Sequence, residues 1–159
     1  MIHNVGAYLL VPSRTTTATE TIDIHNPGAV PGVFHSMKCW IGCRFTLRAT
    51  AVASDSGDNL DIFLQTGFRR KDGVEHWDDF LKFTQVGGDE TAPVEVIAVW
   101  QRGGQTPESE LHADADAALS AGVMQGQISE LLRVNTVVTN TGGNQSFTYE
   151  IWAEPVEEL

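Results

Sequence analysis

Apolar and polar residues alternate with a period of two through much of this chain, and this alternation limits the fold more than any other feature. Such a period is typical of β-strands that bury one face. Four segments show it clearly: 43–51, 59–66, 131–139 and 146–154. The side chains predicted to face a core are Phe45, Leu47, Ala49, Ala51, Leu60, Ile62, Leu64, Leu132, Val134, Val138, Phe147, Tyr149 and Ile151. Three shorter candidates are 7–12, 19–25 and 94–100.

Turn-forming residues separate these strands. Clusters rich in Gly, Asn, Asp and Pro occupy 26–32, 54–59, 86–93 and 140–145. Because such clusters reverse a chain, they predict an antiparallel β-sandwich of the jelly-roll-like or immunoglobulin-like kind. Residues 107–122, rich in Glu, Asp and Ala, depart from the pattern and predict a long acidic loop that is helical in part. With 159 residues and no linker, we expect a single domain, 1–159.

The formal net charge of −11 is distributed unevenly. Residues 1–53 carry +2, residues 54–90 carry −5 and residues 91–159 carry −8. An acidic surface repels phosphate backbones, so we expect no nucleic-acid partner. No apolar run approaches the roughly 20 residues of a membrane helix, and the first residues lack the basic start of a signal peptide. We therefore expect no membrane contact and synthesis in a reducing cytoplasm.

The chain has two cysteines, Cys39 and Cys43. In an extended strand they would point to the same face about 13 Å apart, from the rise of about 3.3 Å per residue. A disulfide needs Cα atoms within about 7 Å of each other. We therefore expect two buried thiols rather than a disulfide or a redox pair.

The stretch FLQTGFRRKDGVEHWDDF (63–80) is the most promising place for chemistry. Basic residues precede its Asp72–Gly73 pair, namely Arg69, Arg70 and Lys71. Acidic and imidazole side chains follow the pair, namely Glu75, His76, Asp78 and Asp79. The adjacent Asp78 and Asp79 point to opposite faces of a strand, so they cannot share a proton or a metal. The stretch predicts a β-hairpin with a solvated, charged tip. Contact of the basic residues with a neighbouring subunit and a catalytic role are the alternatives.

No other cluster has the spacing of a catalytic or metal site. Residues 54–61 (SDSGDNLD) lack the register of an EF-hand loop, and we interpret them as a turn capped by short polar side chains. Acidic residues alternate through 108–116, as in an exposed loop, with weak cation binding or hydrolysis through Asp114 and Asp116 as alternatives. The histidines lack metal-ligand spacing. We expect a non-enzymatic protein with no catalytic residue, cofactor or metal.

The N-terminal residues 1–20 allow two arrangements. An apolar patch, 7–11, precedes a Thr-rich tract. We favour the patch as the first strand of the protein's own sheet. The alternative is that it adds as an edge strand to a neighbouring subunit, in which case Tyr8, Leu9 and Leu10 would belong to a subunit contact.

With the strands placed, the chain resembles a widespread group of small tailed-phage and prophage proteins. These have a Leu-Asp strand ending in Leu-Gln, matched by Leu60, Asp61, Leu64 and Gln65. They have a Trp-Asp strand ending in Phe-Thr-Gln, matched by Trp77, Asp78, Phe83, Thr84 and Gln85. Near the C-terminus they have a Leu-Arg-Val strand, a Gly-containing turn and a Ser-Phe-Thr strand, matched by Leu132, Arg133, Val134, Ser146, Phe147 and Thr148. The resemblance covers about residues 40–155, and the acidic loop at 107–120 departs from the group's shorter connection.

The resemblance implies a virion structural protein without catalytic residues. The expected role is a capsid decoration (cement) protein on the capsid surface, with the major capsid protein or another virion protein as partner. A symmetric homo-oligomer, such as a trimer, is expected with it. A tail or baseplate accessory role is one alternative. A carbohydrate-binding sandwich is another, with stacking platforms among Trp40, Trp77, Trp100 and Trp152.

Overall fold

The computed structural model describes residues 2–4, 7–24, 40–53, 55, 57–101, 131–139, 141 and 145–158. These residues form ten β-strands and no helix, which confirms the predicted all-β class. The strands are β1 (Ile2–Asn4), β2 (Tyr8–Thr16), β3 (Glu20–Asp23), β4 (Trp40–Ala53), β5 (Asn59–Arg69), β6 (Glu75–Lys82), β7 (Val86–Gly87), β8 (Val94–Gln101), β9 (Leu131–Thr139) and β10 (Ser146–Glu158). The described part of the chain contains no helix that is long and apolar enough to cross a membrane. The acidic loop predicted at 107–122 and Cys39 lie outside the described residues.

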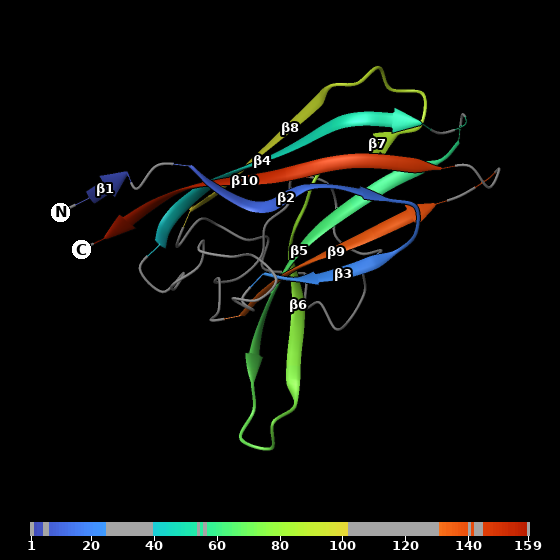
Figure 1. Ribbon diagram of the computed structural model, residues 1–159. Coiled ribbons are helices and arrows are strands. Elements are labelled where there is room, and N and C mark those ends of the chain that lie inside the picture. The colour runs from blue at the N-terminus through green and yellow to red at the C-terminus, as the bar shows by residue number, and fades with distance from the viewer. Residues whose placement is uncertain are drawn as a thin grey trace, which may run out of the picture.

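The strands form two antiparallel sheets stacked as the two layers of a sandwich (Figure 1). One sheet, called sheet A, has the order β1-β10-β4-β8, and β2 also pairs with β10. The other, sheet B, has the order β3-β9-β5-β6, and β7 also pairs with β5. Consecutive strands lie in different sheets at β2/β3, β3/β4, β4/β5, β7/β8, β8/β9 and β9/β10. Both sheets therefore combine strands from distant parts of the sequence.

The core between the sheets contains most of the side chains that alternation predicts. The predicted core residues with at most 1% of their surface exposed are Phe45, Leu47, Ala49, Leu60, Ile62, Leu64, Leu132, Val134, Phe147, Tyr149 and Ile151. Val138 is partly buried and packs against this core. Phe45 of sheet A meets Phe80 of sheet B edge to face, with ring centroids 5.9 Å apart. Aromatic pairs of this geometry add to the free energy gained from burial alone.

The prediction for Ala51 is wrong, because a β-bulge interrupts the alternation of β4. Tyr149 pairs with Ala49 and Thr148 with Ala51, so Thr50 is an extra residue opposite β10. A bulge of this kind shifts the phase of the strand by one residue. Ala51 is consequently exposed, and Val52 packs against the core in its place.

The N-terminal patch forms part of β2, which pairs with β10 in the protein's own sheet. The register shifts between the pairs Ile151–Val11 and Trp152–Leu9, which leaves Leu10 as an extra residue on β2. Leu10 and Val11 are therefore both buried, although they are adjacent in sequence. Leu10 has no exposed surface and is not available for a subunit contact in this fold.

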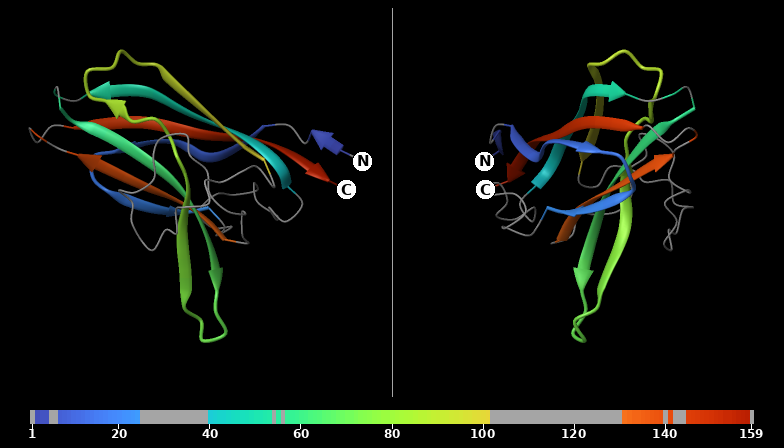
Figure 2. Two further views of the ribbon diagram at one scale, coloured as in Figure 1. Left: turned by 180° about the vertical axis from the view of Figure 1, so that it is seen from behind. Right: turned by 45° about the vertical axis from the view of Figure 1, so that its right-hand side comes forward.

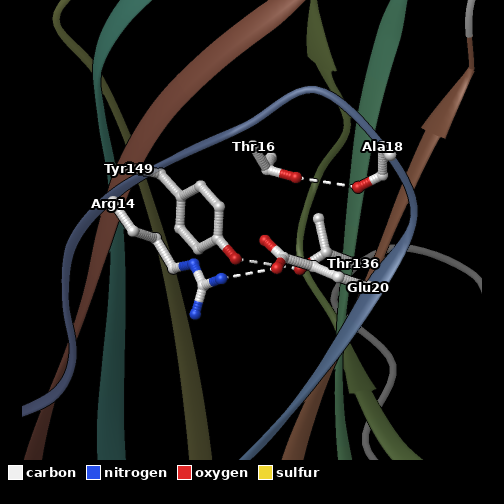
Figure 3. Close-up of polar contacts among 6 residues, drawn as sticks. All are labelled: Arg14, Thr16, Ala18, Glu20, Thr136 and Tyr149. Atoms are coloured by element: carbon white, nitrogen blue, oxygen red, sulfur yellow. Dashed lines mark hydrogen bonds and ion pairs between the residues drawn. The ribbon is translucent and has the colours of Figure 1, made fainter.

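Polar contacts join the two sheets where the chain passes from β2 to β3 (Figure 3). The Tyr149 hydroxyl of β10 lies 2.9 Å from the Thr136 hydroxyl of β9, and both residues are fully buried. Burial raises the pKa of Tyr149, so the phenol stays neutral at physiological pH. Arg14 at the end of β2 pairs with Glu20 at the start of β3, with Nη2 and Oε2 2.5 Å apart. These contacts hold the two sheets together where the chain crosses from one to the other.

The β5–β6 hairpin extends well beyond the rest of the sandwich (Figure 2). β5 pairs with β9 only as far as Gly67, whereas its pairing with β6 continues to Arg69 and Glu75. We call residues 68–76 the arm. The structure thus places a hairpin where the stretch 63–80 predicted one.

Candidate interaction surfaces

A network of polar side chains lies where the arm joins sheet B, and we call Gln65, Gly67, Trp77, Asp79 and Arg133 the root of the arm. Arg133 of β9 donates from Nε to Gln65 Oε1 at 2.6 Å, and Gln65 of β5 donates from Nε2 to Asp79 Oδ1 at 2.5 Å. Gln65 and Asp79 are each only 6% exposed. The network therefore links three neighbouring strands of sheet B. Asp79 belongs to this root, so the expectation that it is one of the solvated charges of the tip is wrong.

Trp77 of β6 completes the root by lying across Gly67 of β5. A Cβ atom at Gly67 would fall 2.7 Å from the indole ring and 2.6 Å from the backbone oxygen of His76, so only glycine leaves this space. The Arg133 guanidinium stacks over the same indole, 4.3 Å from the ring centroid. A guanidinium over an indole face is a favourable cation–π contact. The root thus holds the arm to sheet B through packing as well as through hydrogen bonds.

A second polar group on sheet B surrounds Asp61, which is 8% exposed. Its carboxylate accepts a hydrogen bond from Gln85 Nε2 at 2.8 Å and pairs with Lys82 Nζ at 2.9 Å. The same ammonium lies 5.1 Å from the centroid of the Phe63 ring. Asp61 therefore has partners within the chain and is not a ligand of the kind that a calcium loop would supply.

The tip of the arm has a different character from its root. Arg70 accepts a backbone hydrogen bond from Gly73 and donates one to Val74, and Gly73 adopts a φ of +85°. A positive φ is disfavoured for residues with a Cβ, so the glycine permits this tight reversal. The Asp72 carboxylate accepts a hydrogen bond from the Val74 amide at 3.0 Å. The side chains of Arg70 and Lys71 are exposed at the end of the arm, whereas the Arg69 side chain lies outside the described part of the structure.

The turn before β5 is capped by one buried carboxylate, as the interpretation of 54–61 predicts. Asp58 accepts hydrogen bonds from the backbone amide and the hydroxyl of Thr141, at 2.7 and 2.8 Å, and from the Asp55 amide at 3.1 Å. The bonds from Thr141 lower the pKa of Asp58. Gly57 has a φ of +102°, which this turn requires. Within the described ranges, no three His, Cys, Asp or Glu side chains lie close enough to hold a metal ion.

The edge of sheet A carries an exposed apolar stripe on β8. Among the described residues, β8 pairs only with β4. Its outward side chains include Ile97 and Val99, which are 49% and 54% exposed. In the same register Ile97 lies beside Thr46, and Thr46 lies beside the half-buried Trp152 of β10. An unprotected edge strand with apolar side chains is a place where another chain can bind.

Ion pairs flank this stripe across the outer face of sheet A. Arg44 lies 3.8 Å from Glu154, and Arg48 lies 3.5 Å from Glu150. All four side chains are at least partly exposed, so each pair contributes little to stability. Each pair combines one positive and one negative charge, so this part of the outer face is locally neutral although the net charge of the chain is −11.

The remaining predicted residues are distributed over the core and the surface. Cys43 is a buried free thiol, as expected, and burial raises its pKa. Trp100 is 4% exposed, so it is not a stacking platform for a sugar. Tyr8 and Leu9 are half-buried on β2. The Trp40 side chain and the acidic residues at 108–116 lie outside the described residues.

Sequence reasoning did not identify the link between Gln65, Asp79 and Arg133. Each is a single polar residue in an alternating strand, and the hydrogen bond from Arg133 to Gln65 spans 68 positions of sequence. The only local signal was that each polar side chain falls on the outward face of its strand. No protein-family model, curated protein or solved structure matches this chain.

Proposed function

We propose that this protein is a non-enzymatic structural protein of a tailed-phage virion, and specifically a capsid decoration protein that binds the lattice of the major capsid protein. The proposal begins from the resemblance described above. Surfaces suited to assembly support it further. The observation that carries it is the apolar stripe of β8, Ile97 and Val99, on an edge strand that pairs with only one described neighbour.

The stripe supports an assembly role because monomeric proteins usually protect such an edge. A long edge strand offers unpaired backbone groups to another chain, and natural proteins blunt it with charge, proline or a covering element. β8 has eight residues, and its outward residue Glu95 provides one such charge. Ile97 and Val99 remain about half exposed beside it. A partner that covers them would remove apolar surface from water, which is favourable at about 25 cal/mol per Å².

The balance of charge around the stripe makes a protein surface the fitting partner. Burying an unpaired charge in an interface is costly, so interface centres are depleted of charged residues. The basic residues of the neighbouring strand, Arg44 and Arg48, are already paired with Glu154 and Glu150. A shell subunit can therefore cover this face without desolvating an isolated cation.

The residues that carry the resemblance also support a structural role. Asp61 bonds to Gln85, Gln65 bonds to Arg133, and Arg133 stacks on Trp77. These positions contact one another on sheet B. They are therefore suited to maintaining a scaffold.

The composition of the particle tests the proposal directly. Virions of the phage or induced prophage that encodes this chain are purified, and their proteins are identified by mass spectrometry. Cryo-electron microscopy then locates the chain. We expect density for it on the head surface. Absence of the chain from purified particles would refute the virion role, and density on the tail alone would refute the decoration role.

Charge substitutions on β8 test the proposed docking face. The Ile97→Glu/Val99→Glu variant should fold but should not bind to particles that lack the protein. The Ala51→Glu/Ala53→Glu variant is a matched control, because both alanines are exposed on β4 of the same sheet. It adds the same charge away from the stripe and should bind normally. Equal binding by both variants would exclude the stripe as the docking face.

A further inference from the structure

The tip of the arm presents two cations that have no partner among the described residues. Seven basic side chains are described, and five of them have a partner: Arg14 with Glu20, Arg44 with Glu154, Arg48 with Glu150, Lys82 with Asp61, and Arg133 with Gln65 and Trp77. The two exceptions among the described residues are Arg70 and Lys71, both exposed. Within the described part of the chain, these two cations are the ones that a second molecule could contact.

Acidic side chains gather at the opposite end of β5. Asp55 precedes β5, and Asp89 and Glu90 follow β7; all three are exposed and have no cationic partner among the described residues. The two loops are held together, because the Gly88 amide donates to the Asp58 backbone oxygen at 2.8 Å. We call Asp55, Asp89 and Glu90 the acidic end.

In Figure 1 the tip of the arm lies at the bottom and β7, which precedes Asp89 and Glu90, lies in the upper part. β7 pairs with the first two residues of β5, Asn59 and Leu60, whereas the tip follows its last residue. β5 has 11 residues, which at about 3.3 Å per residue separates the two ends by roughly 35 Å. This distance exceeds the Debye length of about 8 Å at physiological ionic strength, so the two ends do not neutralise each other within one molecule.

We infer that the arm of one copy binds the acidic end of a second copy, with Arg70 and Lys71 of the first facing Asp89 and Glu90 of the second. Opposite charges at opposite ends are complementary in a head-to-tail arrangement and repel in a head-to-head one. Such a contact is heterologous, and it closes into a ring, such as a trimer, or continues as a filament. This inference does not rest on the virion role.

A second copy fits the tip better than a nucleic acid does. Phosphate backbones are repelled by the net charge of −11, which outweighs two cations on one arm. Another copy instead offers a local target of opposite charge, because Asp89 and Glu90 of its acidic end are exposed. The contact is small, so we expect association in solution to be weak and sensitive to salt.

Sedimentation equilibrium of the full-length chain tests the inference. At low ionic strength and high protein concentration, the weight-average mass should rise clearly above the chain mass of 17.3 kDa. At about 1 M salt, where the Debye length is about 3 Å, it should return to that of the monomer. A monomer under all conditions, or an oligomer that salt does not affect, would overturn the inference.

Charge reversal at each end identifies the surfaces. The Arg70→Glu/Lys71→Glu and Asp89→Lys/Glu90→Lys variants should each remain monomeric when alone. When mixed in equal amounts they should associate, because the reversed arm of one variant then faces the reversed acidic end of the other. Asp23→Lys, an exposed position on β3, is the matched control for altered charge and should associate like the unmodified chain.

Each outcome of the mixing experiment decides the question. Association of both single variants, or failure of the mixture to associate, would overturn the head-to-tail contact. If one of the two variants fails to fold, the other still tests the contact. It should not associate, whereas Asp23→Lys should, and this difference separates a contact at the ends from a general effect of charge. Binding to phage particles is measured separately, so this inference and the proposed virion role can fail independently.

Discussion

The hydrogen bond between Tyr149 and Thr136 gives the sharpest test of the sandwich, because it joins the two sheets at a site that water does not reach. The hydroxyl oxygens are 2.9 Å apart, and both residues are fully buried. Removing one partner leaves the other hydroxyl buried without that bond, which costs about 1–3 kcal/mol. We therefore expect Tyr149→Phe and Thr136→Val each to lower the free energy of unfolding by this amount.

The double variant should behave differently from the sum of the two single variants. Phe and Val keep the shape of the site, and replacing both partners by apolar groups is nearly neutral. If each single change costs about 2 kcal/mol, additivity predicts about 4 kcal/mol, whereas we expect the double variant to lose about 1 kcal/mol or less. The difference is the coupling free energy of the pair.

Urea unfolding at pH 7, followed by circular dichroism, measures this cycle. With a slope of about 2 kcal/mol per molar urea, a loss of 2 kcal/mol shifts the midpoint by about 1 M, which is readily measured. Independent sites add to within about 0.5 kcal/mol. Additivity at that level would show that the two hydroxyls do not bond to each other, and would refute this account of how the sheets are joined.

Three further predictions concern the arm, the turn before β5 and the core. Gly67→Ala should destabilise the protein by about 1–3 kcal/mol and alter the fluorescence of Trp77, because the new Cβ would lie 2.7 Å from the indole ring; an unchanged urea midpoint would contradict this packing. Bonds from Thr141 lower the pKa of Asp58, so its contribution to stability is present above the ordinary pKa of about 3.9 and is lost as the pH falls through the lowered value. The difference in the free energy of unfolding between the unmodified protein and Asp58→Asn should therefore shrink as the pH falls. Urea titrations at several pH values measure this difference, and a constant value would contradict the prediction. Burial raises the pKa of Cys43, so in a variant retaining only this cysteine a thiol reagent should react after unfolding in urea but not before.

Alternation in the sequence predicted side chains that face the core between the two sheets. Leu60, Ile62 and Leu64 are inward, as expected. Ala51 is not, because an extra residue on β4 changes the phase midway along the strand. A bulge depends on the register of two strands that are distant in sequence, so a local period cannot reveal it.

The sequence by itself determined the all-β class, the β5–β6 hairpin and the charged reversal at its end, because strand periods and turn residues act over a few neighbouring positions. Only the tertiary structure decided which charged side chains form contacts within the chain. Arg133 lies 68 positions from Gln65 in the sequence, and it reaches the root of the arm because β9 pairs with β5. Gln65 in turn bonds to Asp79 of β6, which is buried. Arg70 and Lys71 lie past the last residue of β5 that pairs with β9, and their side chains are exposed.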